Sequence, residues 1–215
     1  MEIPSYPESN HPLVQFLAQE NDEKLLIMFQ EYPEQGKYFT AIFCRYSSII
    51  YRLIFQSLET PLLTDYIFTQ IWGDIFYEMR GLVLNREGKP EFSSLQNWLL
   101  YLTTLTINEQ QLPDVKSIPS DFQPVSPPLI CYLEQALDLL PPMMRFIFVM
   151  TEKFNWSQTR IAAYLQAEGE TITPTEIEKW LKRAYKMLES AIPEDIRLIY
   201  LDGGTISSEW YFQEI

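Results

Sequence analysis

Basic side chains recur at helical spacing in one segment near residue 180. Together with one hydroxyl they form a single stripe, within about 100° of one another on a helical wheel. The members are Thr175, Lys179, Lys182, Arg183 and Lys186. Such a stripe can follow a nucleic-acid groove, because residues near the helix start reach base edges while later cations neutralise phosphates. The spacing therefore predicts phosphate binding by this helix.

The opposite side of the same segment is apolar and is the expected core face. Its members are Ile177, Trp180, Leu181, Ala184 and Leu188. A charged outer face is also typical of any solvated amphipathic helix, so a plain solvated helix stays open as the alternative. Glu176 and Glu178 favour that alternative, since acids in the first turn suit the helix dipole but repel phosphates.

Residues for metal or nucleophilic chemistry are scarce. The chain has one histidine, His11, and two separated cysteines, Cys44 and Cys131, which are too few for an ordinary zinc site or a catalytic triad. The sequence contains no glycine-rich phosphate loop. Acids are plentiful, so a carboxylate acid–base pair stays open, but these acids are scattered over helical faces. We expect no enzyme, no metal and no organic cofactor.

The cysteines and the apolar runs indicate the compartment. Two thiols in apolar surroundings predict free, buried cysteines in a reducing cytosol. The longest apolar runs fall far short of the roughly 20 residues that span a bilayer. Residues 1–10 also lack the basic start of a signal peptide. We therefore expect a cytoplasmic protein with no membrane contact.

The net charge of −13 argues against unspecific affinity for nucleic acids, which depends on neutralising phosphates. The location of the charge reduces this objection. Residues 1–20, 109–128 and 194–215 have net charges of −3, −2 and −4. The stretches between them have charges of only −3 and −1. The excess of acid is therefore peripheral.

Apolar residues spaced by three and four predict an all-α protein. The expected helices cover residues 21–32, 37–58, 62 or 64 to 82, 93 or 94 to 108, 129–140, 143–154, 156–166 and 174–190. Five prolines between residues 111 and 128 predict an extended linker. We expect two small helical domains, 21–108 and 129–193, joined by the linker 109–128. An N-terminal segment (1–20) precedes them and an acidic, aromatic tail (194–215) follows, with a weak strand signal at 196–201.

An ordered set of positions runs through the second expected domain. They are Leu140-Pro141-Pro142, Arg145, Ser157, Ile161-Ala162, Leu165, Ile177, Leu181, Arg183-Ala184 and Leu188. This set resembles the promoter −35-binding domain of bacterial sigma factors. The resemblance implies a helix-turn-helix formed by residues 156–190. It implies base contacts near Thr175 and phosphate contacts from the four cations that follow.

The first expected domain matches a family pattern more loosely. The positions are Phe39, Phe43, Arg45-Tyr46, Ile50-Tyr51, then residues 65–72, and Trp98-Leu99 with Leu102. They resemble the polymerase-binding and −10-binding domain of the two-domain, extracytoplasmic-function sigma factors. The resemblance implies polymerase contacts from Tyr66, Gln70 and Asp74, with a plain solvated face as the alternative. The implied partners are core RNA polymerase and promoter DNA, and the family also admits an anti-sigma protein.

Three features depart from the family pattern. Residues 95–106 contain no lysine, arginine or histidine. Leu105 stands where the family has an asparagine that reads the −10 element. The turn at 166–173 is longer, and the tail has no family counterpart; its composition is more typical of a docking or autoinhibitory segment than of a DNA arm. We expect a sigma-factor-like transcription factor. The alternative is a sigma-derived regulatory or scaffold protein that acts through protein–protein contacts without promoter recognition.

Overall fold

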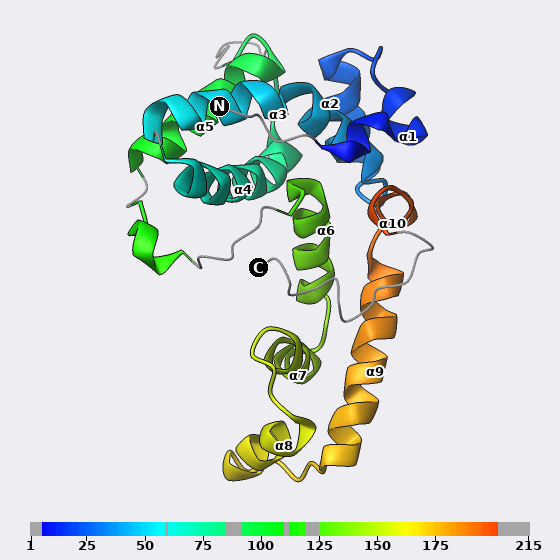
Figure 1. The fold of residues 1–215 in the computed structure, drawn as a ribbon. Coiled ribbons are helices and arrows are strands. Elements are labelled where there is room, and N and C mark those ends of the chain that lie inside the picture. Colours follow the sequence, from blue (N-terminus) through cyan, green and yellow to red (C-terminus); the bar gives the residue numbers. More distant parts are fainter. Residues whose placement is uncertain (1–5, 59, 85–91, 110–111, 119–124, 202–215) are drawn as a thin grey trace.

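The computed structural model describes residues 6–58, 60–84, 92–109, 112–118 and 125–201. This part of the chain is all-helical and has no strand, as the sequence predicts. Helices α1–α5 gather at one end of the molecule, and α6–α9 extend away from them (Figure 1). None of the described helices is both long enough and apolar enough to cross a membrane.

We refer to residues 6–118 as the N-terminal half and to residues 125–201 as the C-terminal half. The N-terminal half contains α1 (Pro12–Gln15), α2 (Asp22–Glu31), α3 (Lys37–Leu58), α4 (Pro61–Glu78) and α5 (Leu95–Glu109). Short 3-10 helices lie at Pro7–Asn10, Met79–Gly81 and Val115–Ser117. The C-terminal half contains α6 (Pro127–Asp138), α7 (Pro142–Glu152), α8 (Gln158–Ala167), α9 (Pro174–Ala191) and α10 (Glu194–Tyr200).

Helices α3 and α4 form the centre of the N-terminal half because each has a wide stripe of large apolar side chains. Phe39 and Phe43 of α3 and Trp72 of α4 are completely buried. The rings of Phe43 and Trp72 meet edge-on, with centroids 4.9 Å apart. Burying a side chain of this size stabilises the fold by roughly 1.5–3 kcal/mol. The helix pair is thus held by its aromatic residues.

The N-terminal segment, from residue 6 onward, packs on α2 and α3. Val14 and Leu17 are buried in the main core. The Arg45 guanidinium of α3 forms a salt bridge with Asp22, at 2.5 Å between Nη1 and Oδ1. Its Nη2 donates a hydrogen bond to the Glu20 carbonyl at 2.7 Å. One arginine therefore fastens the end of this segment to the start of α2.

A small second core lies between α7, α8 and α9. Its buried members are Ile147, Ile161, Ala162, Leu165, Ile172 and Ile177. Helix α8 begins after Ser157, whose Oγ accepts a hydrogen bond from the Arg160 backbone N–H at 3.2 Å. Ser157 is therefore the N-cap of α8. Helices α7 and α8 are thereby packed against the first half of α9.

The main core continues from the N-terminal half into α6, α9 and α10. Tyr132 of α6 is 2% exposed, and its ring centroid lies 5.0 Å from that of Phe76 in α4. Leu188 of α9 and Ile196 of α10 are completely buried in the same cluster. Figure 1 shows α6 between α4 and the upper part of α9. The two halves thus share one apolar core.

Residues 194–200 differ from the sequence expectation, which placed them in the tail with a weak strand signal. They form α10, with Glu194 and Asp195 in its first turn and Ile196 buried. The spacing of Ile196, Ile199 and Tyr200 is helical, and the acids suit the positive end of the helix dipole. The rest of the expected tail, 202–215, lies outside the described residues.

Candidate nucleic-acid interface

Helix α9 begins with a capping box. The Thr173 hydroxyl accepts a hydrogen bond from the Glu176 N–H at 3.3 Å, and the Glu176 carboxylate accepts one from the Thr173 N–H at 2.8 Å. Pro174 occupies the first helical position, where its missing N–H costs nothing. The Thr173 hydroxyl and N–H together lower the pKa of the Glu176 carboxyl. The helix therefore starts where the sequence predicts.

The predicted basic stripe lies on the solvent-exposed side of α9. All five residues of the stripe, Thr175, Lys179, Lys182, Arg183 and Lys186, are exposed. On the opposite side Ile177, Ala184 and Leu188 are completely buried, while Trp180 and Leu181 are partly buried. This confirms the expected core face. The stripe is held outward because the core side of α9 packs against α7 and α8.

Acidic residues accompany the stripe and reduce its positive charge. The Lys182 ammonium forms a salt bridge with Glu178, one turn earlier, at 2.6 Å. That pairing lowers the pKa of the Glu178 carboxyl. Within the described part of the chain, Lys179, Arg183 and Lys186 make no salt bridge. Three cations of the stripe are therefore available to an anionic partner without breaking an ion pair.

The connection from α8 to α9 is compact despite its length. Gly169 has a φ of +95°, in the left-handed region that favours glycine at the end of a helix. The Gln166 side-chain amide donates a hydrogen bond to the Ile172 carbonyl at 2.7 Å. Ile172 is itself buried in the small core. The longer turn therefore folds back on α8, which leaves Glu168 and Glu170 exposed to solvent.

Arg145, one of the positions behind the sigma-factor resemblance, has a structural partner. Its Nη1 lies 2.8 Å from Asp138 Oδ1, and its Nη2 donates a hydrogen bond to the Asp138 carbonyl at 2.7 Å. The guanidinium therefore binds the C-terminal end of α6, whose exposed carbonyls attract a cation. This position orients α7 relative to α6.

The three predicted polymerase contacts follow one another at intervals of four along α4. Gln70 and Asp74 are exposed, and Tyr66 is partly buried. Partial burial, with a smaller contribution from Glu78, raises the pKa of the Asp74 carboxyl. Helix α6 packs against α4, and Arg80, just after the end of α4, donates a hydrogen bond to Gln135 of α6 at 3.1 Å. The three residues lie on one side of α4, as predicted, and Gln70 and Asp74 stay accessible.

Helix α10 joins the two halves through a contact that the sequence did not predict. The Asp195 carboxylate accepts hydrogen bonds from the backbone N–H groups of Gly36 and Lys37, at 3.0 and 2.9 Å. It thereby caps the start of α3 from a position 159 residues away. At the other end of α10, the Tyr200 hydroxyl donates a hydrogen bond to the buried Glu8 at 3.2 Å. The Ser126 hydroxyl also donates to Glu8.

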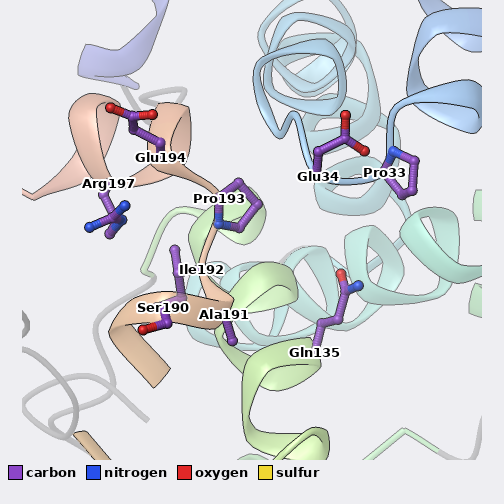
Figure 2. A pocket seen from close by; sticks show the side chains of 9 residues that line it. All are labelled: Pro33, Glu34, Gln135, Ser190, Ala191, Ile192, Pro193, Glu194 and Arg197. Carbon is purple, nitrogen blue, oxygen red and sulfur yellow. The ribbon is translucent and has the colours of Figure 1, made fainter. Parts of the chain in front are cut away.

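A pocket of about 450 Å³ lies beside this junction. Figure 2 shows it between the loop before α3, the middle of α6 and the α9–α10 connection. Its charged and polar lining includes Glu34, Gln135, Glu194 and Arg197. Figure 2 shows the carboxylates of Glu34 and Glu194 and the Arg197 guanidinium pointing in different directions, so they offer no convergent set of groups for one reaction. We therefore find no candidate catalytic centre in it.

The thiols and acids of the described residues build no metal site. No group of three or more histidine, cysteine, aspartate or glutamate side chains there could hold an ion. Cys131 is buried and Cys44 is half-buried, and both are free. Burial raises the pKa of the Cys44 thiol to about 12. Each thiol is therefore held in its unreactive, protonated form.

A comparison of the chain with protein-family models, curated proteins and solved structures found no match. The candidate interface on α9 is therefore defined by its own residues and geometry.

Proposed function

We propose that this chain is a sigma-factor-like transcription factor that binds core RNA polymerase and promoter DNA. The observation that supports the proposal is the exposed basic stripe of α9, which lies opposite the apolar face that packs into the core. A helix held in this way by α7 and α8 presents its cations as one surface. That is the arrangement a recognition helix needs in order to enter a major groove.

In this proposal the start of the stripe contacts bases and the later part contacts phosphates. Thr175, near the start of α9, lies close to base edges, where a hydroxyl can donate or accept a hydrogen bond. The four cations that follow neutralise phosphates and fix the position of the helix on the duplex; they are Lys179, Lys182, Arg183 and Lys186. Helix α8 crosses the sugar–phosphate backbone of the DNA as the first helix of a helix-turn-helix.

The second contact of the proposal is with polymerase, through the exposed side of α4. Gln70 and Asp74 supply hydrogen-bonding groups on a rigid helix, so their positions are set by the packing of α4 on α3. An interface of this kind gains specificity from polar groups at its rim.

The test combines a pulldown on core RNA polymerase with run-off transcription from candidate promoters. The proposal expects binding to core polymerase and a defined transcript. It also expects Lys179→Ala with Arg183→Ala to abolish the transcript but not core binding. The matched control is Lys116→Ala with Lys153→Ala, which removes two exposed cations elsewhere. Failure of the unaltered protein to bind core polymerase would contradict the proposal.

A second candidate is a regulatory or scaffold protein derived from a sigma factor, which acts through protein contacts alone. The shared core of the two halves favours it, because a promoter-bound factor must place two DNA-reading surfaces far apart. The absence of lysine, arginine and histidine from residues 95–106 also favours this second candidate. Binding to core polymerase without any affinity for DNA at low salt would support this candidate.

A further inference from the structure

A shallow apolar groove lies between the C-terminal end of α6 and the second half of α9. Its volume is about 440 Å³. Its lining includes the apolar side chains of Leu139, Leu140 and Met187, and it also includes Arg183 and Lys186. Two cations of the basic stripe therefore also border an apolar surface.

The groove has an apolar side chain with no covering partner in the described part of the chain. Leu139 is 64% exposed, more than any other large apolar side chain described in the C-terminal half. Arg183 and Lys186 are exposed and make no salt bridge among the described residues. Apolar surface next to unpaired cations fits a ligand that is both apolar and anionic.

One segment of the chain has this composition. Residues 202–215, which lie outside the described residues, contain three consecutive aromatic residues, Trp210, Tyr211 and Phe212. Glu209 directly precedes them, Glu214 follows, and the segment has no lysine or arginine. Its aromatic centre suits the apolar lining, and its carboxylates suit the basic edge.

We propose that residues 202–215 bind in the groove between α6 and α9. The aromatic side chains contact Leu139 and Met187, and the flanking carboxylates pair with Arg183 and Lys186. The chain is long enough for this. Only the short helix α10 separates the segment from the end of α9. The nine residues from Leu201 to Trp210 can span up to about 30 Å when extended. The distance from α10 back to the groove is on the order of 20 Å, from about 1.5 Å per helical residue.

The segment would act on the basic stripe as a tethered competitor. A short tether gives an effective concentration on the order of millimolar, so even weak binding occupies the groove for much of the time. Occupancy removes two of the three unpaired cations from an incoming phosphate backbone. This regulatory consequence rests on the proposed function, whereas the binding of the segment rests on the groove alone.

Photocrosslinking in the full chain tests the binding without reference to DNA. Trp210 is replaced by benzoylphenylalanine, and the crosslinked peptides are identified by mass spectrometry. The proposal expects intramolecular crosslinks to residues 136–140 or 183–191. The same probe in place of Phe16, which is 81% exposed in the N-terminal half, should give none there. Crosslinks spread over the surface, or formed only between two chains, would overturn the proposal.

A DNA-binding measurement then tests the consequence. Trp210→Ser with Phe212→Ser, and separately Leu139→Ser, should each tighten DNA binding by about threefold or more, as expected for release of a weak tethered ligand. Phe16→Ser alters an exposed aromatic residue of the N-terminal half, away from the groove and from α8 and α9, and serves as the matched control. If the groove variant, the segment variant and the unaltered protein bind DNA with equal affinity, the proposed competition is overturned. If no variant binds DNA, the proposed function fails and the crosslinks still decide the binding.

Discussion

At the residue scale, the junction of the two halves depends on the missing side chain of Gly36. A Cβ at this position would lie 2.2 Å from Ile196 Cγ1 and 2.9 Å from the Tyr132 ring. Both neighbours are buried, so neither can move away freely. The close approach lets Asp195 reach the first backbone N–H groups of α3.

We expect Gly36→Ala to lower the free energy of unfolding by about 1–3 kcal/mol, because overpacking forces α10 away from α3. Urea denaturation measures the change. Gly73→Ala is the control: it lies in α4 with nothing within 4 Å of the added Cβ, and it should raise the free energy by about 0.5–1 kcal/mol. Equal effects at the two glycines would contradict the close approach.

Asp195 gives a second prediction at this scale. Asp195→Ala removes the cap of α3 and should lower the free energy of unfolding by about 1–2 kcal/mol. Its neighbour Glu194 is exposed and makes no described hydrogen bond, so Glu194→Ala should change stability by less than about 0.5 kcal/mol. Thermal melts of the two variants, run side by side, measure the difference. A smaller loss for Asp195→Ala than for Glu194→Ala would refute the capping contact.

At the element scale, the start of α9 positions the whole basic stripe. Thr173→Ala removes one half of the capping box and should cost about 1 kcal/mol of stability. Thr175→Ala removes an exposed hydroxyl two residues later and should leave stability within about 0.5 kcal/mol. Chemical denaturation separates the two. In the proposed function, Thr175→Ala should weaken DNA binding more than Thr173→Ala does, since Thr175 is the residue near base edges.

The capping box also predicts a pH dependence. The pKa of the Glu176 carboxyl is lowered in the folded protein below its usual 4.5. A lowered pKa means that this contribution is fully present above the usual value and is lost as pH falls through the folded one. Hydrogen exchange at the first turn of α9 should therefore speed up below about pH 4.5 relative to the intrinsic rate. Glu176→Gln should remove that dependence, and an unchanged profile in this variant would contradict the assignment.

Local sequence patterns predict some helix boundaries and core faces but not others. The start of α9 was predictable because Thr173, Pro174 and Glu176 form a local signature of a helix N-terminus. The core faces of α3, α4 and α9 were predictable from the spacing of their apolar residues. Helix α10 was missed because Pro193 marks the end of α9 equally well as the start of a new helix. Its seven residues also give too short a periodic pattern.

At the scale of the whole molecule, the shared apolar core couples the unfolding of the two halves. The prediction of two domains rests on the proline-rich linker, and the contact between Asp195 and Gly36 joins the two halves across 159 positions of sequence. No local pattern indicates such a pair. The basic stripe could be predicted from α9 alone, whereas the groove beside it could not, because it needs the position of α6.

We expect the chain to unfold in one cooperative transition, since α4 and α9 are parts of the same core. Amide hydrogen exchange in increasing urea measures this, and protection in the two helices should be lost together. Tyr132→Ala should lower the stability of both by about 3–5 kcal/mol, because the ring packs against both halves. Loss of protection in the second half of α9 while α3 and α4 stay protected would contradict a shared core.

The central claim is that the basic stripe of α9 binds DNA, and the salt dependence of binding tests it most directly. Affinity for a promoter-length duplex is measured between about 50 and 200 mM salt. If the four cations contact phosphates, the log–log slope should be about −3 to −4, and it should fall in magnitude by about one for each cation replaced by alanine. A flat response, or no binding at the lowest salt, would contradict the account and favour a protein that acts through protein contacts alone.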